Sequence, residues 1–329
     1  MSRLYAATGD AVAAISGENG AWSVRLGLAE SGAQCVAADP ANPEVVYAGS
    51  RGAGVWRSGD GGSDWNDCEL PGDDVFSVAV SAADGAVYAG CEPSMLFRSR
   101  DGGAHWEELE TLREIPSAPS WSFPPRPWTS HVRWVAPSPH DADRLLVGIE
   151  LGGVMLSEDG GATWDDHRPG AQRDCHALAW HPSAADRAYE AGGGGAAWSF
   201  DGGENWRAAD EGRDRNYTWA LAVDPDDPDR WFVSASAGPR NAHGRGDPKA
   251  MLYRWQGEGP WVGLGGGRPE PLEAMPYALA FSGGDLFAGF TDGAMYRSDD
   301  RGESWERLEL EGDPLELVMA LAAAPADPG

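Results

Sequence analysis

The chain has 329 residues, of which 42% are hydrophobic, enough for the core of one large domain or two ordinary ones. Its formal net charge of -27 disfavours binding to nucleic acid or to anionic membranes, because phosphate recognition needs clustered basic side chains. No apolar run approaches the roughly 20 residues of a membrane-spanning helix, and the N-terminus lacks the pattern of a secretory signal. We therefore expect a cytoplasmic, monomeric protein.

Residues 3–28 form three short alternating runs separated by turn signals, which predicts three β-strands. The turn between the second and third run reads SGENGAW. Its Ser16, Gly20 and Trp22 are the remains of a motif, S-x-D-x-G-x-x-W, that is complete further along the chain.

The complete motif occurs five times, at Ser58–Trp65, Ser99–Trp106, Ser157–Trp164, Ser199–Trp206 and Ser298–Trp305. Its serines lie 41 residues apart from Ser58 to Ser99, and 42 apart from Ser157 to Ser199. This period is typical of a four-stranded propeller blade. The longer gaps are explained by a Pro-rich insertion before residue 131 and by a degenerate blade that ends near Trp261.

Three predicted strands precede each motif or its degenerate copy, which gives six complete blades. The C-terminal segment LELVMALAAAP predicts one strand with no partner after it, and this is the innermost strand that the N-terminal segment lacks. The sequence therefore predicts an all-β protein, a single seven-bladed β-propeller over residues 1–329. Blade 7 is divided between residues 1–30 and 313–329.

In these motifs and their spacing the chain resembles the Asp-box, or BNR-repeat, β-propellers. That group includes sialidases, xyloglucan-cleaving glycosidases, sortilin-type receptors and the photosystem II assembly factor. The resemblance covers nearly the whole chain and implies the fold. It does not imply one function, because the same repeat serves hydrolases, receptors and scaffolds.

The motifs themselves are interpreted as hairpin turns between the third and fourth strands. The aspartate can accept backbone N–H bonds, the glycines permit positive φ, and the tryptophan can bury a large apolar face. Each motif offers too few carboxylates for the six to eight oxygens that calcium prefers. Cys35, Cys68, Cys91 and Cys175 have no C-x-x-C spacing and are predicted to be core residues.

A functional site is expected on the face of the propeller opposite these hairpin turns, which we call the top face. On that face, the loops that lead into the first strands lie beside the loops that join second and third strands. Blades 3 to 5 depart from the repeat there, at two levels of the first strand. The first level has His131, Asp174 and Tyr217, and the second, two residues later and on the same side of the strand, has Arg133, His176 and Trp219.

Two glutamates, Glu150 and Glu190, precede glycines near the ends of the second strands of blades 3 and 4, and they are predicted to occupy equivalent places. Two insertions reach the same sector, the Pro-rich one before blade 3 and GPRNAHGRGDPKA at residues 238–250 in blade 5. The predicted catalytic residues are Glu150, Glu190, His131, His176 and Tyr217. The predicted ligand-binding residues are Arg133, Asp174, Trp219, Arg240, His243, Arg245, Trp128 and Tyr277.

Three functions remain open. A glycosidase-like hydrolase would use Glu150 and Glu190 as acid and base, although the early F/Y-R-I-P segment of sialidases is absent. A metal-assisted lyase would hold a divalent ion with His131, His176 and His243, together with Glu150 or Glu190. Both interpretations predict a polar or anionic small molecule, such as a carbohydrate, as the ligand. The third function is a non-catalytic scaffold for a protein partner.

Overall fold

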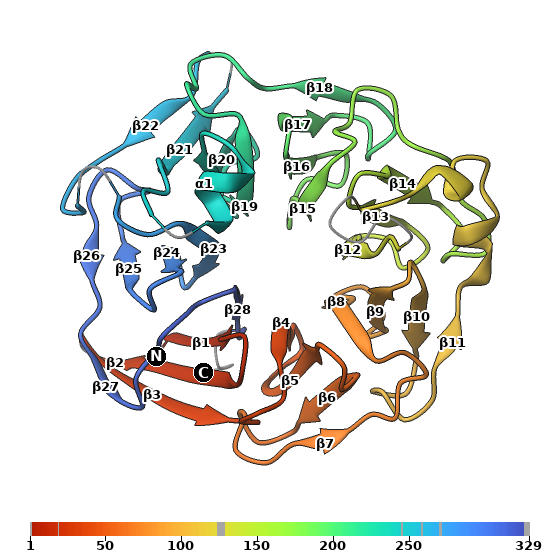
Figure 1. The fold of residues 1–329 in the computed structure, drawn as a ribbon, viewed down its shortest axis with the longest axis horizontal. Helices are drawn as coiled ribbons and strands as arrows, with labels where there is room; N and C mark the ends of the chain where they lie inside the picture. The colour runs from red at the N-terminus through yellow and green to blue at the C-terminus, as the bar shows by residue number, and fades with distance from the viewer. Residues whose placement is uncertain are drawn as a thin grey trace.

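The computed structural model describes residues 2–18, 20–123, 129–244, 246–257, 259–269 and 272–325. It shows the predicted seven-bladed β-propeller. Figure 1 views the ring along its axis, with the innermost strand of every blade nearest that axis and the first and last strands, β1 and β28, in one blade. Among the described residues, no helix combines the length and the hydropathy of a membrane-spanning segment.

Blades 1 to 3 follow one another along the chain, and each runs from the channel outward. Blade 1 consists of β4 (Ala33–Asp39), β5 (Asn42–Ser50), β6 (Val55–Ser58) and β7 (Asn66–Asp67). Blade 2 consists of β8 (Asp74–Val80), β9 (Val87–Glu92), β10 (Leu96–Ser99) and β11 (Glu107–Glu108). Blade 3 consists of β12 (Val132–Pro137), β13 (Leu145–Ile149) and β14 (Gly153–Ser157), with the bridge Leu156–Asp165 in the place of a fourth strand.

Blades 4 to 6 repeat the arrangement. Blade 4 consists of β15 (Cys175–Trp180), β16 (Ala188–Gly192), β17 (Gly195–Ser199) and β18 (Trp206–Ala208). Blade 5 consists of β19 (Tyr217–Val223), β20 (Arg230–Ser236), β21 (Met251–Gln256) and β22 (Val262–Leu264). Blade 6 consists of β23 (Pro276–Ser282), β24 (Asp285–Phe290), β25 (Met295–Ser298) and β26 (Glu306–Arg307).

Blade 7 closes the ring with strands from both ends of the chain, as predicted. The C-terminal β28 (Ala320–Ala323) pairs antiparallel with β1 (Ser2–Ala7), which continues into β2 (Val12–Glu18) and β3 (Ala21–Gly27). The sequence did not predict a further outer strand, β27 (Leu310–Gly312), which pairs parallel with β3. Pairing the two ends ties down the termini, which are otherwise the first parts of a domain to fray.

The repeated motif is a hairpin turn, as interpreted from the sequence. In blade 3, Ser157 Oγ donates to Asp159 Oδ1 at 3.0 Å and accepts the N–H of Gly161 at 2.8 Å. Thr163 donates its N–H to the same Asp159 oxygen at 2.8 Å. Gly161 has φ +88°, a left-handed conformation that favours glycine. The site must therefore be sought away from these turns.

The two insertions add short helices. Two 3-10 helices, Glu110–Glu114 and Ala118–Ser120, lie before β12, and α1 (Pro239–His243) lies between β20 and β21. All four cysteines are buried and unpaired, as predicted for core residues. The core itself lies between neighbouring blades: Trp206 of blade 4, for example, packs in one cluster with Leu146 of blade 3.

Candidate functional site

A β-bulge re-aims one side chain of the first strand in blades 1 to 6. In blade 3, Val132 pairs with Ile149 and Trp134 pairs with Gly148, which leaves Arg133 without a partner in the ladder. Bulges bend a strand and redirect the extra residue, and they are common beside functional sites. The residues redirected into the channel wall are Gln34, Phe76, Arg133, His176, Trp219 and Tyr277.

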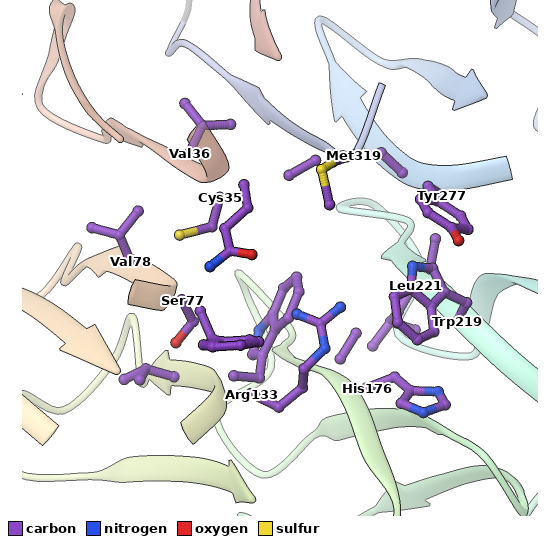
Figure 2. Close-up of a pocket in the computed structure, with 18 of the residues that line it drawn as sticks. Cys35, Val36, Ser77, Val78, Arg133, His176, Trp219, Leu221, Tyr277 and Met319 are labelled. Carbon is purple, nitrogen blue, oxygen red and sulfur yellow. The ribbon is translucent and has the colours of Figure 1, made fainter. Parts of the chain in front are cut away.

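These residues surround a cavity of about 790 Å³ in the central channel. Figure 2 shows Arg133, His176, Trp219, Tyr277 and Met319 around the opening, with Met319 contributed by the C-terminal segment. Further along the same strands the wall consists of small apolar side chains, including Val36, Val78 and Leu221. A mostly apolar cavity of this size with a few polar groups at its mouth is typical of small-molecule sites.

Glu150 is held by two basic side chains from the first strand of its own blade. His131 Nε2 donates to Glu150 Oε2 at 2.7 Å, and Arg133 Nε lies 3.7 Å from the same oxygen. His131 is buried, stacks on Phe76 with ring centroids 3.9 Å apart, and has Nδ1 at 3.4 Å from Glu92 Oε2. The histidine therefore connects the carboxylates of blades 2 and 3.

The opposite wall consists of aromatic side chains from blades 5 and 6. Tyr217 and Tyr277 are joined through His243: Tyr217 Oη lies 2.7 Å from His243 Nε2, and His243 Nδ1 lies 2.5 Å from Tyr277 Oη. Tyr277 donates to the carbonyl of Ala242 at 3.2 Å. Its hydroxyl therefore accepts from Nδ1, and Tyr217 donates to Nε2. Trp219 packs between these rings.

His176 of blade 4 lies between the two walls. Its Nδ1 donates to the carbonyl of Thr218 at 2.6 Å, and its Nε2 lies 3.5 Å from Asp174 Oδ1. Glu150, Asp174 and His176 each place one potential ligand atom within 4.8 Å of the others. Among the described residues this is the group that could hold a metal. It shares His176 and Glu150 with the predicted set, but Asp174 takes the place of His131 and His243.

The environment sets the protonation of several site residues. Burial raises the pKa of Glu150, but the hydrogen bond from His131 and the charge of Arg133 outweigh it, so the net pKa is lowered and the carboxylate is ionised at neutral pH. Desolvation, reinforced by His176, lowers the pKa of His243 to about 4. Burial raises the pKa of Tyr277 to about 12 and that of Tyr217 further, so both phenols stay protonated.

The predicted equivalence of Glu150 and Glu190 is wrong. Glu190 pairs with Leu178 in the middle of β16, a position that corresponds to Val147 in blade 3, and it is fully buried. It does not line the cavity. The residue that corresponds to Glu150 is Gly193, directly after β16. Glu190 is therefore not placed to act as the second carboxylate of a glycosidase.

The remaining predicted residues divide into three groups. The cavity wall contains His131, Arg133, Glu150, Asp174, His176, Tyr217, Trp219, His243 and Tyr277. Arg240 is exposed on α1 and does not line the cavity. Trp128 and Arg245 lie outside the described residues.

Sequence reasoning missed two charged residues of the wall, Arg51 and Glu92. Arg51 directly follows Ser50, and Glu92 directly follows Cys91. The register shows that Ser50 and Cys91 correspond to Ile149, one residue before Glu150. Counting the bulge in each first strand would have found them.

Comparison with known proteins identifies the fold. No protein-family model matches the chain, and none of the curated proteins matches it. Among solved structures, the GH74 xyloglucanase from Xanthomonas campestris has a TM-score of 0.67 at 18% identity, over 98% of this chain and 52% of the enzyme. An ancestral GH74 enzyme also has a TM-score of 0.67, at 19% identity, over 85% of this chain and 39% of that enzyme.

A smaller propeller, YCF48 from Cyanidioschyzon merolae, has a TM-score of 0.60 at 14% identity, over 87% of this chain and 86% of YCF48. A structure of YCF48 bound to D1 peptide is also similar, with a TM-score of 0.59 at 15% identity, over 84% of this chain and 82% of that one. The chain thus spans about half or less of the GH74 enzymes and most of YCF48. At these identities the likeness shows the propeller fold alone.

Proposed function

We propose that the protein binds a small anionic carbohydrate, a sugar acid, at the mouth of its central channel. The observation that carries this proposal is the state of Arg133. Its side chain is 17% exposed, its nearest carboxylate oxygen is 3.7 Å from Nε, and its guanidinium makes no hydrogen bond within the described part of the chain. A guanidinium has five N–H donors, and a ligand carboxylate can accept two of them at once.

The aromatic wall complements this charge. Arg133 lies over Trp219 with its guanidinium carbon 4.7 Å from the ring centroid, which fixes the plane of the cation. Trp219 and Tyr277 both line the cavity, with ring centroids 5.4 Å apart and ring planes inclined by 33°. Aromatic side chains of this kind suit the C–H groups of a pyranose ring whose acidic group reaches Arg133.

Two carboxylates serve the hydroxyl groups of the same ligand. Glu150, ionised, and Asp174 both line the cavity and can accept hydrogen bonds from a sugar. Acid and base chemistry on this ligand belongs to the same pair, since Glu190 lies outside the cavity. Glu150 suits the role of the base, because the hydrogen bond from His131 and the charge of Arg133 lower its pKa and keep it deprotonated.

A protein scaffold is the alternative, and the structure of YCF48 bound to D1 peptide is what favours it. Docking surfaces are expected to expose contiguous apolar side chains. Across the described ranges the one exposed large hydrophobic residue is Val262, at 50%. The small-molecule function is therefore the better supported of the two.

The test compares two sugars that differ only at C6, D-glucuronate and D-glucose, by isothermal titration calorimetry. We expect glucuronate to bind at least about tenfold more tightly, the difference that one charge-assisted hydrogen bond can supply. Arg133→Gln removes this preference. Arg100→Gln is the matched control, because Arg100 lies in the motif turn of blade 2 and its side chain is 62% exposed.

Equal affinity of the two sugars, or an unchanged preference in Arg133→Gln, would rule out the proposed ligand class. A protein partner that is retained by the wild type and lost in Arg133→Gln, with no sugar binding, would establish the scaffold instead.

A further inference from the structure

We infer that Glu150, Asp174 and His176 form a binding site for a divalent transition-metal ion, Zn²⁺ or Mn²⁺, in the wall of the channel. Three donors from blades 3 and 4 converge there with their ligand atoms within 4.8 Å of one another. Two of the three side chains are almost completely buried, Glu150 at 8% and His176 at 1% exposure. This inference does not depend on the identity of the organic ligand.

The hydrogen bonding of His176 is the first argument for a cation. The carbonyl of Thr218 only accepts, so the 2.6 Å contact places the proton of the neutral ring on Nδ1 and leaves a lone pair on Nε2. Nε2 is buried and has no hydrogen-bond partner in the described ranges, and Asp174 Oδ1 faces it at 3.5 Å. Two lone pairs that face each other repel, whereas a cation between them is attracted to both.

Hydrogen bonds hold two of the three donors in the way that is usual for metal ligands. Metal-binding histidines usually donate their other N–H to a backbone carbonyl or carboxylate, and metal-binding carboxylates are themselves hydrogen-bonded. His176 follows this rule through Thr218, and Glu150 follows it through His131, which donates to Oε2 at 2.7 Å. Both recorded basic contacts of Glu150 use Oε2, which leaves Oε1 for an ion.

A glycine, Gly193, leaves space for the carboxylate of Asp174. A Cβ atom on Gly193 would lie 1.8 Å from Asp174 Oδ2. The φ of Gly193 lies outside the left-handed region between +20° and +160°, so its conformation does not require glycine. The missing side chain instead lets the carboxylate of Asp174 cross the loop at the top of blade 4, and the N–H of Gly193 holds the Asp174 carbonyl at 2.8 Å.

The charge of the cavity wall points the same way. Its described residues include the three carboxylates of Glu92, Glu150 and Asp174, against the two guanidiniums of Arg51 and Arg133. An enclosed excess of negative charge is costly unless a cation compensates it. A divalent ion at Glu150, Asp174 and His176 would reverse the local balance beside Arg133.

The donor set selects the class of ion. One imidazole nitrogen and two carboxylate oxygens suit Zn²⁺ or Mn²⁺, whereas Ca²⁺ prefers six to eight oxygens. Tetrahedral ligands at about 2.0–2.2 Å from an ion lie about 3.4 Å from each other. The 3.5 Å between His176 Nε2 and Asp174 Oδ1 already matches this spacing, and one potential ligand atom of Glu150 lies within 4.8 Å of those of both residues.

The experiment uses the full chain, stripped with EDTA and dialysed, and titrated with ZnCl₂, MnCl₂ or CaCl₂ in a calorimeter. We expect one Zn²⁺ or Mn²⁺ per chain and weaker binding of Ca²⁺. His176→Gln and Asp174→Asn should each lower the affinity at least about tenfold. Co²⁺ provides a second measurement, because the intensity of its visible absorption reports its coordination geometry, and the strong absorption of a tetrahedral ion should be lost in His176→Gln.

His105→Gln is the matched control. His105 and Asp101 form a histidine–aspartate pair like that of His176 and Asp174, with His105 Nδ1 2.6 Å from Asp101 Oδ2. This pair lies in the exposed motif turn of blade 2. This variant should bind the metal ion as the wild type does, and circular dichroism checks that every variant is folded. Absence of a stoichiometric ion in the wild type, or equal affinity in His176→Gln, would overturn the site. No sugar is present, so this result is independent of the glucuronate titration.

Discussion

The guanidinium carbon of Arg133 lies 4.7 Å from the ring centroid of Trp219. Arg133 belongs to blade 3 and Trp219 to blade 5, and both side chains line the channel. His176 of the intervening blade lies 4.6 Å from the same ring. Three successive bulges thus bring a cation, an imidazole and an indole into contact. Because their contacts are shared, substitutions at these positions should not have additive effects on binding.

Arg133→Lys tests whether the planar shape of the cation matters in addition to its charge. A lysine ammonium cannot lie flat on Trp219 and cannot donate two parallel hydrogen bonds to a carboxylate. We expect glucuronate affinity to fall about tenfold in this variant, measured by titration of tryptophan fluorescence. Wild-type affinity in Arg133→Lys would show that charge alone is sufficient.

Gly193→Ala tests the metal site without changing a ligand. The new methyl group would occupy the position of Asp174 Oδ2, so the carboxylate must move and metal affinity should fall about tenfold. Gly238→Ala is the control, because a Cβ there meets nothing within 4 Å and requires no unusual φ. Equal metal affinity in both variants would contradict the proposed role of Gly193.

Glu190→Gln tests the buried carboxyl of blade 4 through its pH dependence. Burial raises the pKa of Glu190 from its ordinary value of 4.5 to about 8. The folded chain therefore binds this proton more tightly than the unfolded chain, and stability is lost as the pH rises from 4.5 through 8. Between pH 5 and pH 9, the free energy of unfolding of Glu190→Gln relative to wild type should rise by a few kcal/mol.

Urea denaturation at the two pH values measures this difference, with Glu306→Gln, whose side chain is 75% exposed, as the control. If the Glu190→Gln variant had the same relative stability at both pH values, the carboxyl would titrate normally in the fold.

Ser157→Ala separates the repeated turn from the site. It removes the acceptor for the Gly161 N–H, a buried hydrogen bond of 2.8 Å. We expect a loss of about 1–2 kcal/mol in the free energy of unfolding and no change in glucuronate affinity. Weaker binding in a folded Ser157→Ala protein would show that the turn and the channel mouth are coupled.

The fold could be predicted because its evidence is repeated. Five complete motifs give the blade period, and the missing first strand near Ser16 is supplied by the C-terminal segment before Pro325. The site was predicted in part, because Arg133, His176 and Trp219 depart visibly from plain residues at the same level. The bulges gave no sequence signal of their own, yet they are what turns these side chains into the channel.

The register of the second strands could not be predicted reliably. Both Glu150 and Glu190 precede glycines, but the hairpin of blade 4 turns later after its glutamate, so Glu190 pairs in mid-strand and Gly193 takes the corresponding place. The same uncertainty hid Glu92, which follows Cys91. A difference of one to three residues moves a side chain between core and cavity, because strand residues alternate between the two faces.

The central claim, that the channel mouth is the ligand site, is tested most directly by a crystal structure of the protein soaked with D-glucuronate. We expect a sugar ring against Trp219, with its carboxylate within hydrogen-bond distance of the Arg133 guanidinium. Glucuronate bound elsewhere, or a channel mouth that contains only water at a saturating concentration, would contradict it.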